Sequence, residues 1–136
     1  MIEKVFLGIV GGAYLVLAAW CMVAPATTAQ AVGFELQPGS GQSEYLVVYG
    51  GLQLGLGCFF IWPVFWRPEA ISAAIVASFF IHAAIVLLRS IGFLLYADFE
   101  ETTLVLAAVE WVILISTLLV WNHHRRQNDE LSGKTA

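Results

Sequence analysis

Two oppositely charged residues, Arg89 and Glu110, lie inside long apolar stretches of the sequence. A bare charge in the hydrocarbon core of a membrane costs about 3 kcal/mol on insertion scales, so charges at such positions usually have a function. Arg89 lies nine residues before Asp98, and Glu110 lies nine residues after Glu101. At about 1.5 Å per residue, both lie about 13 Å from the turn that joins their two helices. We therefore predict an ion pair.

Polar side chains recur at helical spacing on both sides of this predicted pair, and residues four or seven apart share one helix face. The first stripe contains Ser78, His82, Arg89 and Tyr96, and the second contains Thr103, Glu110 and Thr117. If the two stripes face each other, they form a polar seam inside the protein. Tyr49 and Gln53, four residues apart, join this polar seam from an earlier helix, and Glu44 marks its outer mouth.

The polar seam suits the binding of a small molecule. We expect Arg89 to hold an anionic or carbonyl group and Glu110 to balance its charge. Orienting hydrogen bonds would come from Tyr49, Gln53 and His82. Two alternatives remain open, since the charge pair can serve helix register alone and His82 can be a hydrogen-bonded core residue.

The sequence contains no metalloprotease helix, nucleophile elbow, phosphate loop or dinucleotide fingerprint. Its two cysteines form no zinc pattern, and a single histidine within the apolar stretches cannot supply both axial ligands of a b-type haem. We therefore expect no catalytic residue, metal or cofactor and favour a non-enzymatic protein. An enzyme that uses Glu110 as a general acid or base stays an alternative.

The elements that must hold these side chains are membrane-spanning helices. Hydrophobic residues make up 60% of the 136-residue chain and charged residues 12%, and the mean hydropathy is +0.82. These values exclude an ordinary water-soluble domain. Four stretches can cross about 30 Å of hydrocarbon: residues 5–24, 46–66, 70–97 and 102–121. We predict an all-α integral membrane four-helix bundle, with one domain over 1–122 and a polar tail over 123–136.

The basic residues predict the orientation of this bundle. Five of the six lie in segments on one side of the predicted spans, namely Lys4, Arg67, Arg125, Arg126 and Lys134. Short basic segments mark the cytoplasmic face. We predict an up-down-up-down topology in a bacterial inner membrane, with both termini cytoplasmic.

The net charge of −4 gives no indication of a nucleic-acid partner. Membrane lipids are the expected partners, together with an amphipathic ligand. The connection over residues 25–43 either caps the outer side or re-enters the membrane. A cleaved signal peptide is the alternative for the first span, although its apolar run exceeds the usual signal core of about 7 to 15 residues.

Glycines at a spacing of four allow helices to approach closely in lipid. The first predicted span contains Gly8 and Gly12, and the second contains Gly51 and Gly55. We expect these glycines to pack against neighbouring helices of the same chain. A seam between copies of the chain, or with a larger membrane complex, is the alternative.

Residues 44–57, followed by Arg89-Ser90-Ile91-Gly92 and Glu110, resemble small bacterial membrane proteins grouped as domain of unknown function 4345. The resemblance covers nearly the whole chain in length, span number and motif order. Its most specific part is the Tyr-Gly-Gly-Leu of residues 49–52 with the Leu-Gly-Leu-Gly of residues 54–57. Family members commonly have a basic residue where this chain has Leu46. The resemblance implies four transmembrane helices and intramembrane Arg and Glu, without an established activity.

Together these patterns favour a small membrane protein whose polar seam binds or passes a hydrophobic or amphipathic small molecule. An accessory or assembly subunit of a larger membrane complex is one alternative. A proton-coupled transporter or an intramembrane enzyme that uses Glu110 is the other.

Overall fold

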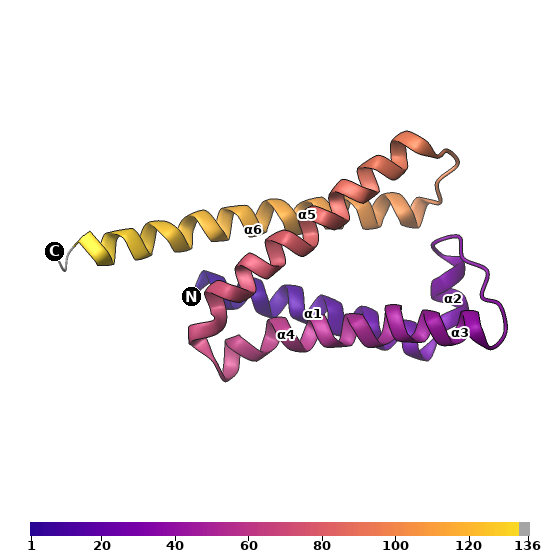
Figure 1. The fold of residues 1–136 in the computed structure, drawn as a ribbon, viewed down its shortest axis with the longest axis horizontal. Coiled ribbons are helices and arrows are strands. Elements are labelled where there is room, and N and C mark those ends of the chain that lie inside the picture. The colour runs from indigo at the N-terminus through magenta and orange to yellow at the C-terminus, as the bar shows by residue number, and fades with distance from the viewer. Residues whose placement is uncertain (134–136) are drawn as a thin grey trace.

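The computed structural model describes the backbone of residues 1–133 and the side chains of residues 1–126, and these residues form helices and no strands (Figure 1). Lys134 of the predicted tail lies outside the described residues. The helices are α1 (Ile2–Val23), α2 (Pro25–Gln30), α3 (Ser40–Tyr45), the π-helical η1 (Leu46–Leu52), α4 (Gln53–Phe65), the short 3-10 turn η2 (Pro68–Ala70), α5 (Ile71–Leu95) and α6 (Glu101–Gly133).

Four helical segments are long and apolar enough to cross a membrane: Ile2–Val23, Ser40–Phe65, Pro68–Leu95 and Glu101–Arg126. The prediction of an all-α protein with four such helices is confirmed. The second segment begins six residues before the predicted start at residue 46, because α3 and η1 continue directly into α4. The helix of the fourth segment continues through the predicted polar tail to Gly133.

Local sequence explains where the helices end. Pro25 and Pro68 each start a new helix at its first turn, a position that does not need the backbone N–H that proline lacks. Asp98, in the turn between α5 and α6, has a φ of 60°. Aspartate tolerates this left-handed conformation better than most residues. The turn therefore closes tightly and returns α6 antiparallel to α5.

The start of α1 and the end of α6 lie at one end of the bundle, here called the terminal end, and α2 and α3 cover the opposite cap end (Figure 1). The connection over residues 25–43 thus forms a cap, in which Ala29 of α2 is fully buried. At the terminal end, the Nδ1 atom of His124 lies 3.6 Å from Oε1 of the buried Glu3. This contact joins α6 to the start of α1.

Helices α1 and α4 pack closely because two glycines meet between them. A Cβ atom on Gly11 would lie 3.0 Å from the carbonyl oxygen of Gly57, and a Cβ on Gly57 would lie 3.0 Å from that of Gly11. The same added atom on Gly11 would lie 2.6 Å from the side chain of Ile61. Gly11 and Gly57 therefore set the distance between these two helices.

The prediction that Gly8, Gly12, Gly51 and Gly55 pack within the chain is wrong. A Cβ atom on Gly8, Gly12 or Gly55 would meet nothing within 4 Å, and one on Gly51 would meet only the Leu46 carbonyl of its own helix, at 4.0 Å. Spacing identifies a small-residue face but not the rotation of the helix that carries it. Whether these outward glycines contact another chain stays a prediction.

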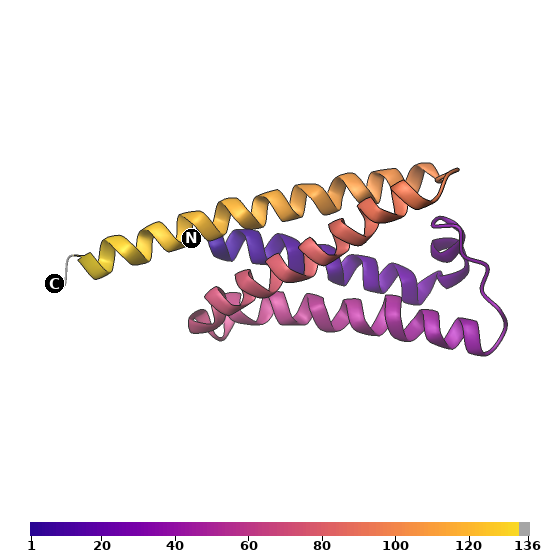
Figure 2. The same cartoon turned by 45° about the horizontal axis from the view of Figure 1, so that its top comes forward.

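Helix α5 crosses the bundle diagonally. Figures 1 and 2 show it near α4 at the terminal end and beside α6 at the cap end. The terminal half is closed by an apolar cluster that includes Leu7, Phe60 and Ile75. Toward the cap end α5 diverges from α4, and the polar side chains of both helices border the space between them.

Candidate functional site

Arg89 of α5 and Glu110 of α6 form a bidentate ion pair. The Arg89 Nε donates to Glu110 Oε2 over 2.9 Å, and Nη2 donates to Oε1 over 2.6 Å. The predicted pair is therefore present, because the two antiparallel helices bring positions at equal distance from their turn to the same depth. The Arg89 side chain is 30% exposed and that of Glu110 16%. This residual exposure shows that the pair borders open space.

The pair lines a cavity of about 300 Å³ at the cap-end half of the bundle, here called the central cavity. Its wall draws on every long helix and on the cap: Leu17, Trp20, Cys21, Thr28, Ala31, Val32, Tyr45, Tyr49, Gln53, Ile85, Arg89, Thr102, Leu106 and Glu110. The wall is mostly apolar, with the ion pair and a few hydrogen-bonding groups set into it. Such a composition is typical of small-molecule sites.

Polar groups of the central cavity remain unpaired within the protein. The Gln53 Oε1 atom is buried and has no hydrogen-bond partner among the described residues. Nearly all buried polar atoms in proteins have a partner, so such an atom needs an explanation. The Tyr49 ring lies close by, and no hydrogen bond to its hydroxyl is found over residues 1–126. The central cavity thus presents both an acceptor and a donor.

Tyr45 connects the cap to the central cavity. Its hydroxyl donates to Thr28 Oγ1 over 2.9 Å, and its ring stacks on that of Tyr49 with centroids 4.5 Å apart. Tyr45 directly precedes the π-helical η1 and Tyr49 lies within it, and π-helical turns are frequent at functional sites. Tyr45 was not among the predicted site residues, although its spacing of four from Tyr49 was a signal. No sequence pattern indicated Thr28, which lies in the long connection.

Three other polar residues of the predicted seam, Ser78, His82 and Thr117, form a second cluster nearer the terminal end. Ser78 Oγ lies 3.2 Å from Thr117 Oγ1 and 3.3 Å from His82 Nδ1. His82 Nδ1 also lies 2.8 Å from the Ser78 carbonyl oxygen, which can only accept, so Nδ1 carries the proton. His82 Nε2 then accepts from the Tyr14 hydroxyl over 3.2 Å. Both ring nitrogens of His82 thus have a partner, as in a structural core histidine.

Tyr14 was absent from the predicted seam, although a phenol in the middle of the first apolar span was a usable signal.

The first predicted stripe meets the second at two places, Ser78 with Thr117 and Arg89 with Glu110. Only the second place borders the central cavity.

Three predicted residues lie elsewhere. Tyr96 is 71% exposed, because α5 ends at Leu95 and the extended backbone at Tyr96 breaks the seven-residue spacing. Thr103 is buried between helices, and its neighbour Thr102 lines the central cavity instead. Glu44 is exposed and borders a separate pocket of the cap, so none of these three residues lines the central cavity.

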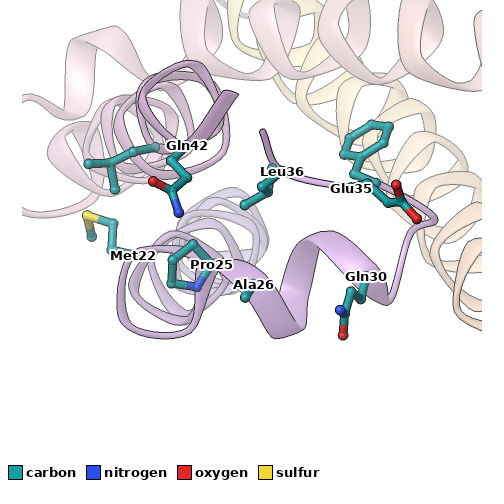
Figure 3. Close-up of a pocket in the computed structure, with 9 residues that line it drawn as sticks. Met22, Pro25, Ala26, Gln30, Glu35, Leu36 and Gln42 are labelled. Carbon is teal, nitrogen blue, oxygen red and sulfur yellow. The ribbon is translucent and has the colours of Figure 1, made fainter. Parts of the chain in front are cut away.

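The cap contains a larger pocket of about 570 Å³ (Figure 3). Its lining is Met22, Pro25, Ala26, Gln30, Phe34, Glu35, Leu36, Gln42 and Leu46, of which only Glu35 is charged. The Gln42 Oε1 already accepts a hydrogen bond from the backbone N–H of Gly39, 3.3 Å away. This pocket contains no ion pair and no residue of the predicted seam, so the central cavity is the better candidate site.

No protein-family profile matches the chain, and no curated protein or solved structure matches it. The resemblance to the domain of unknown function 4345 family therefore stays a prediction. Of the residues on which this resemblance rests, five line the central cavity, namely Tyr45, Tyr49, Gln53, Arg89 and Glu110.

Proposed function

We propose that this protein is a non-enzymatic membrane protein that binds or passes a small amphipathic molecule in the central cavity. The observation that carries the proposal is the Arg89–Glu110 ion pair on the wall of a mostly apolar cavity that also holds the unpaired Gln53 Oε1. Apolar walls would take the hydrocarbon part of the ligand. The charged and polar groups would orient its oxygen-bearing head.

The geometry of Glu110 favours binding over catalysis. Both of its carboxylate oxygens accept hydrogen bonds from Arg89. A proton transfer through Glu110 would have to break this pair first, because each carboxylate oxygen already accepts a hydrogen bond from Arg89. A pair that served helix register alone would need no cavity beside it.

We place the protein in a bacterial inner membrane, with the terminal end cytoplasmic and lipids as its immediate partners. Lys4, Arg67, Arg125 and Arg126 belong to segments of the terminal end, and positively charged segments favour the cytoplasmic side. A reporter fused to the carboxyl end tests this orientation. Activity of a periplasm-dependent reporter such as alkaline phosphatase at that position would contradict it.

Native mass spectrometry of the protein purified in mild detergent tests the proposed binding. We expect a co-purified small molecule with the wild type and with Ala108→Leu, which changes an exposed position of α6. Ala31→Leu adds three carbons to a residue that lines the central cavity, so it should release that molecule. Equal occupancy in the two variants, or an empty wild type that also fails to take up added amphiphiles, would refute the proposal.

A second candidate function is that of an accessory subunit in a larger membrane complex. The open space at Gly8, Gly12 and Gly55 favours it, because small residues on an outer helix face permit close approach of another helix. Purification from native membranes separates the candidates. A stoichiometric protein partner would support the accessory role, and a preparation of this chain with bound small molecule would support the first candidate.

A further inference from the structure

The central cavity has a neighbour on the outer side of α5. A pocket of about 360 Å³, here called the side pocket, is lined by Ile85, Leu88, Arg89, Gly92, Phe93 and Phe99. Two of these residues, Ile85 and Arg89, also line the central cavity. Arg89 therefore stands between the two spaces, and its side chain is the only polar one in the side pocket.

The side pocket faces the surroundings of the bundle. Leu88 on its wall is 67% exposed, as expected for a lipid-facing side chain of a membrane-spanning helix. Phe93 and Phe99 pack edge to face, with centroids 4.7 Å apart, on the side nearest the turn to α6. Arg89 lies six residues before Leu95, or about 9 Å inside the end of α5. At that depth the side pocket meets hydrocarbon chains.

Arg89 retains hydrogen-bonding capacity after pairing. A guanidinium group has five N–H donors, of which Nε and one Nη2 hydrogen serve Glu110, so three remain. No protein acceptor for the Nη1 donors is found among residues 1–126. A ligand oxygen can therefore bind Arg89 while Glu110 stays in place.

The charge balance selects the type of oxygen. The Arg89–Glu110 pair is neutral as a whole, so an added anion would bring net negative charge into a region of low dielectric constant. A carbonyl oxygen accepts the same hydrogen bond without that cost. The unpaired Gln53 Oε1, which α4 contributes to the wall of the same cavity, lacks a hydrogen-bond donor, and a ligand hydroxyl would supply one.

We propose that the ligand is a neutral amphiphile with a carbonyl and a hydroxyl group, such as a monoacylglycerol, and that it enters sideways from the lipid through the side pocket. Its head would occupy the central cavity, with the carbonyl on Arg89 and a hydroxyl on Gln53. Its hydrocarbon tail would leave through the side pocket, past Gly92. This inference rests on the proposed function and adds a chemical class and a route.

Gly92 allows a direct test of the route. A Cβ atom at this position would meet nothing within 4 Å, so a large side chain can fill the side pocket without disturbing the helix packing. Gly55 is the matched control, since it is equally open and lines a different outward pocket, on α4. Binding of tritium-labelled monoolein to the purified protein in detergent micelles gives the association rate and the amount bound at saturation.

We expect saturable monoolein binding by the wild type and by Gly55→Phe. Association with Gly92→Phe should be about tenfold slower, because the access path is obstructed while the central cavity is unchanged. Gly92→Leu provides a second variant if the phenylalanine lowers the yield of folded protein. An unchanged association rate in both Gly92 variants would overturn the side route and leave the proposed function standing.

Tritium-labelled oleate, which is anionic at neutral pH, tests the chemical class. We expect it to bind at least about tenfold more weakly than monoolein, a difference of 1.4 kcal/mol. Tighter binding of oleate would overturn the assignment to a neutral carbonyl ligand. Absence of saturable binding for both probes, together with no co-purified molecule, would instead remove the proposed function itself.

Discussion

Tyr14 of α1 donates a hydrogen bond to Nε2 of His82 in α5 across 3.2 Å, which joins the first helix to the third membrane-spanning helix. The opposite ring nitrogen, Nδ1, donates to the Ser78 carbonyl oxygen. Every nitrogen of this buried imidazole thus has a partner, and α5 is held at a defined rotation. That rotation aims Arg89, seven residues further along α5, at Glu110 and at the central cavity.

We expect Tyr14→Phe to destabilise the protein by about 1 kcal/mol, because His82 Nε2 loses its only donor while the ring packing against Phe60 remains. Thermal unfolding of the purified protein in detergent measures the change. Tyr96→Phe is the control, since that side chain is 71% exposed. Equal melting temperatures for Tyr14→Phe and the wild type would contradict a role of this bond in orienting α5.

Removal of one member of the ion pair should cost more than removal of both. Arg89→Leu leaves the Glu110 carboxylate uncompensated between the helices, and we expect a loss of about 3 kcal/mol of unfolding free energy. The double variant Arg89→Leu with Glu110→Met should recover most of that loss. Denaturant unfolding of four proteins, namely the wild type, Arg89→Leu, Glu110→Met and the double variant, measures the coupling between the two sites.

A matched control for the ion pair exists at the terminal end. Arg67 and Glu69 form a pair of 3.0 Å with side chains that are 59% and 65% exposed. We expect Arg67→Leu to change the unfolding free energy by less than about 1 kcal/mol, as is usual for exposed pairs. Strictly additive losses at Arg89 and Glu110 would argue against their coupling.

Neighbouring glycines of α1 should respond differently to the same change. Gly11→Val places a Cβ atom 2.6 Å from the Ile61 side chain and 3.0 Å from a backbone oxygen, so the two helices must separate. We expect a loss of about 2–3 kcal/mol or failure to fold. A Cβ atom on Gly12 would meet nothing within 4 Å, so we expect Gly12→Val to be tolerated. The two variants are compared by their yield of monodisperse protein and by their thermal stability. A less stable Gly12→Val than Gly11→Val would refute the packing described for α1 and α4.

Tyr45→Phe should loosen the cap while leaving the helices intact. The variant loses the hydrogen bond from the Tyr45 hydroxyl to Thr28 but keeps the ring stack on Tyr49. A lost bond of about 1 kcal/mol corresponds to about fivefold faster amide hydrogen exchange in α2. Exchange followed by mass spectrometry measures it, with Tyr49→Phe as the control because no protein partner of its hydroxyl is found over residues 1–126. Identical exchange in α2 for both variants would exclude Tyr45 as the link.

The Arg89–Glu110 pair could be predicted from the sequence because the prediction needed only the geometry of single helices and of the turn that joins them. The rise per residue and a short turn determine which positions of a helical hairpin lie at equal depth. The two predicted stripes also contained Ser78 and Thr117, but the depth rule did not predict their contact, because Ser78 lies 20 residues before Asp98 and Thr117 lies 16 after Glu101. Tyr96 was misplaced because the stripe rule holds only while the helix continues, and the backbone is already extended at that residue.

The packing glycines could not be predicted in the same way. Gly11 and Gly12 are adjacent in the sequence and point about 100° apart on a helix, so spacing alone favours whichever has a partner four residues away. The choice of Gly11 depends on Gly57 and Ile61, which belong to another helix. Thr28 reached the central cavity only because the long connection folds into α2 over the cap end.

By itself, the sequence determined that four apolar helices form and that two opposite charges lie at one depth, because hydropathy, length and rise are properties of single helices. The tertiary structure decided which helix faces meet, where α5 diverges from α4, and hence that a cavity of about 300 Å³ exists beside the ion pair. These features arise from contacts between side chains distant in sequence, which determine the rotation and crossing of each helix.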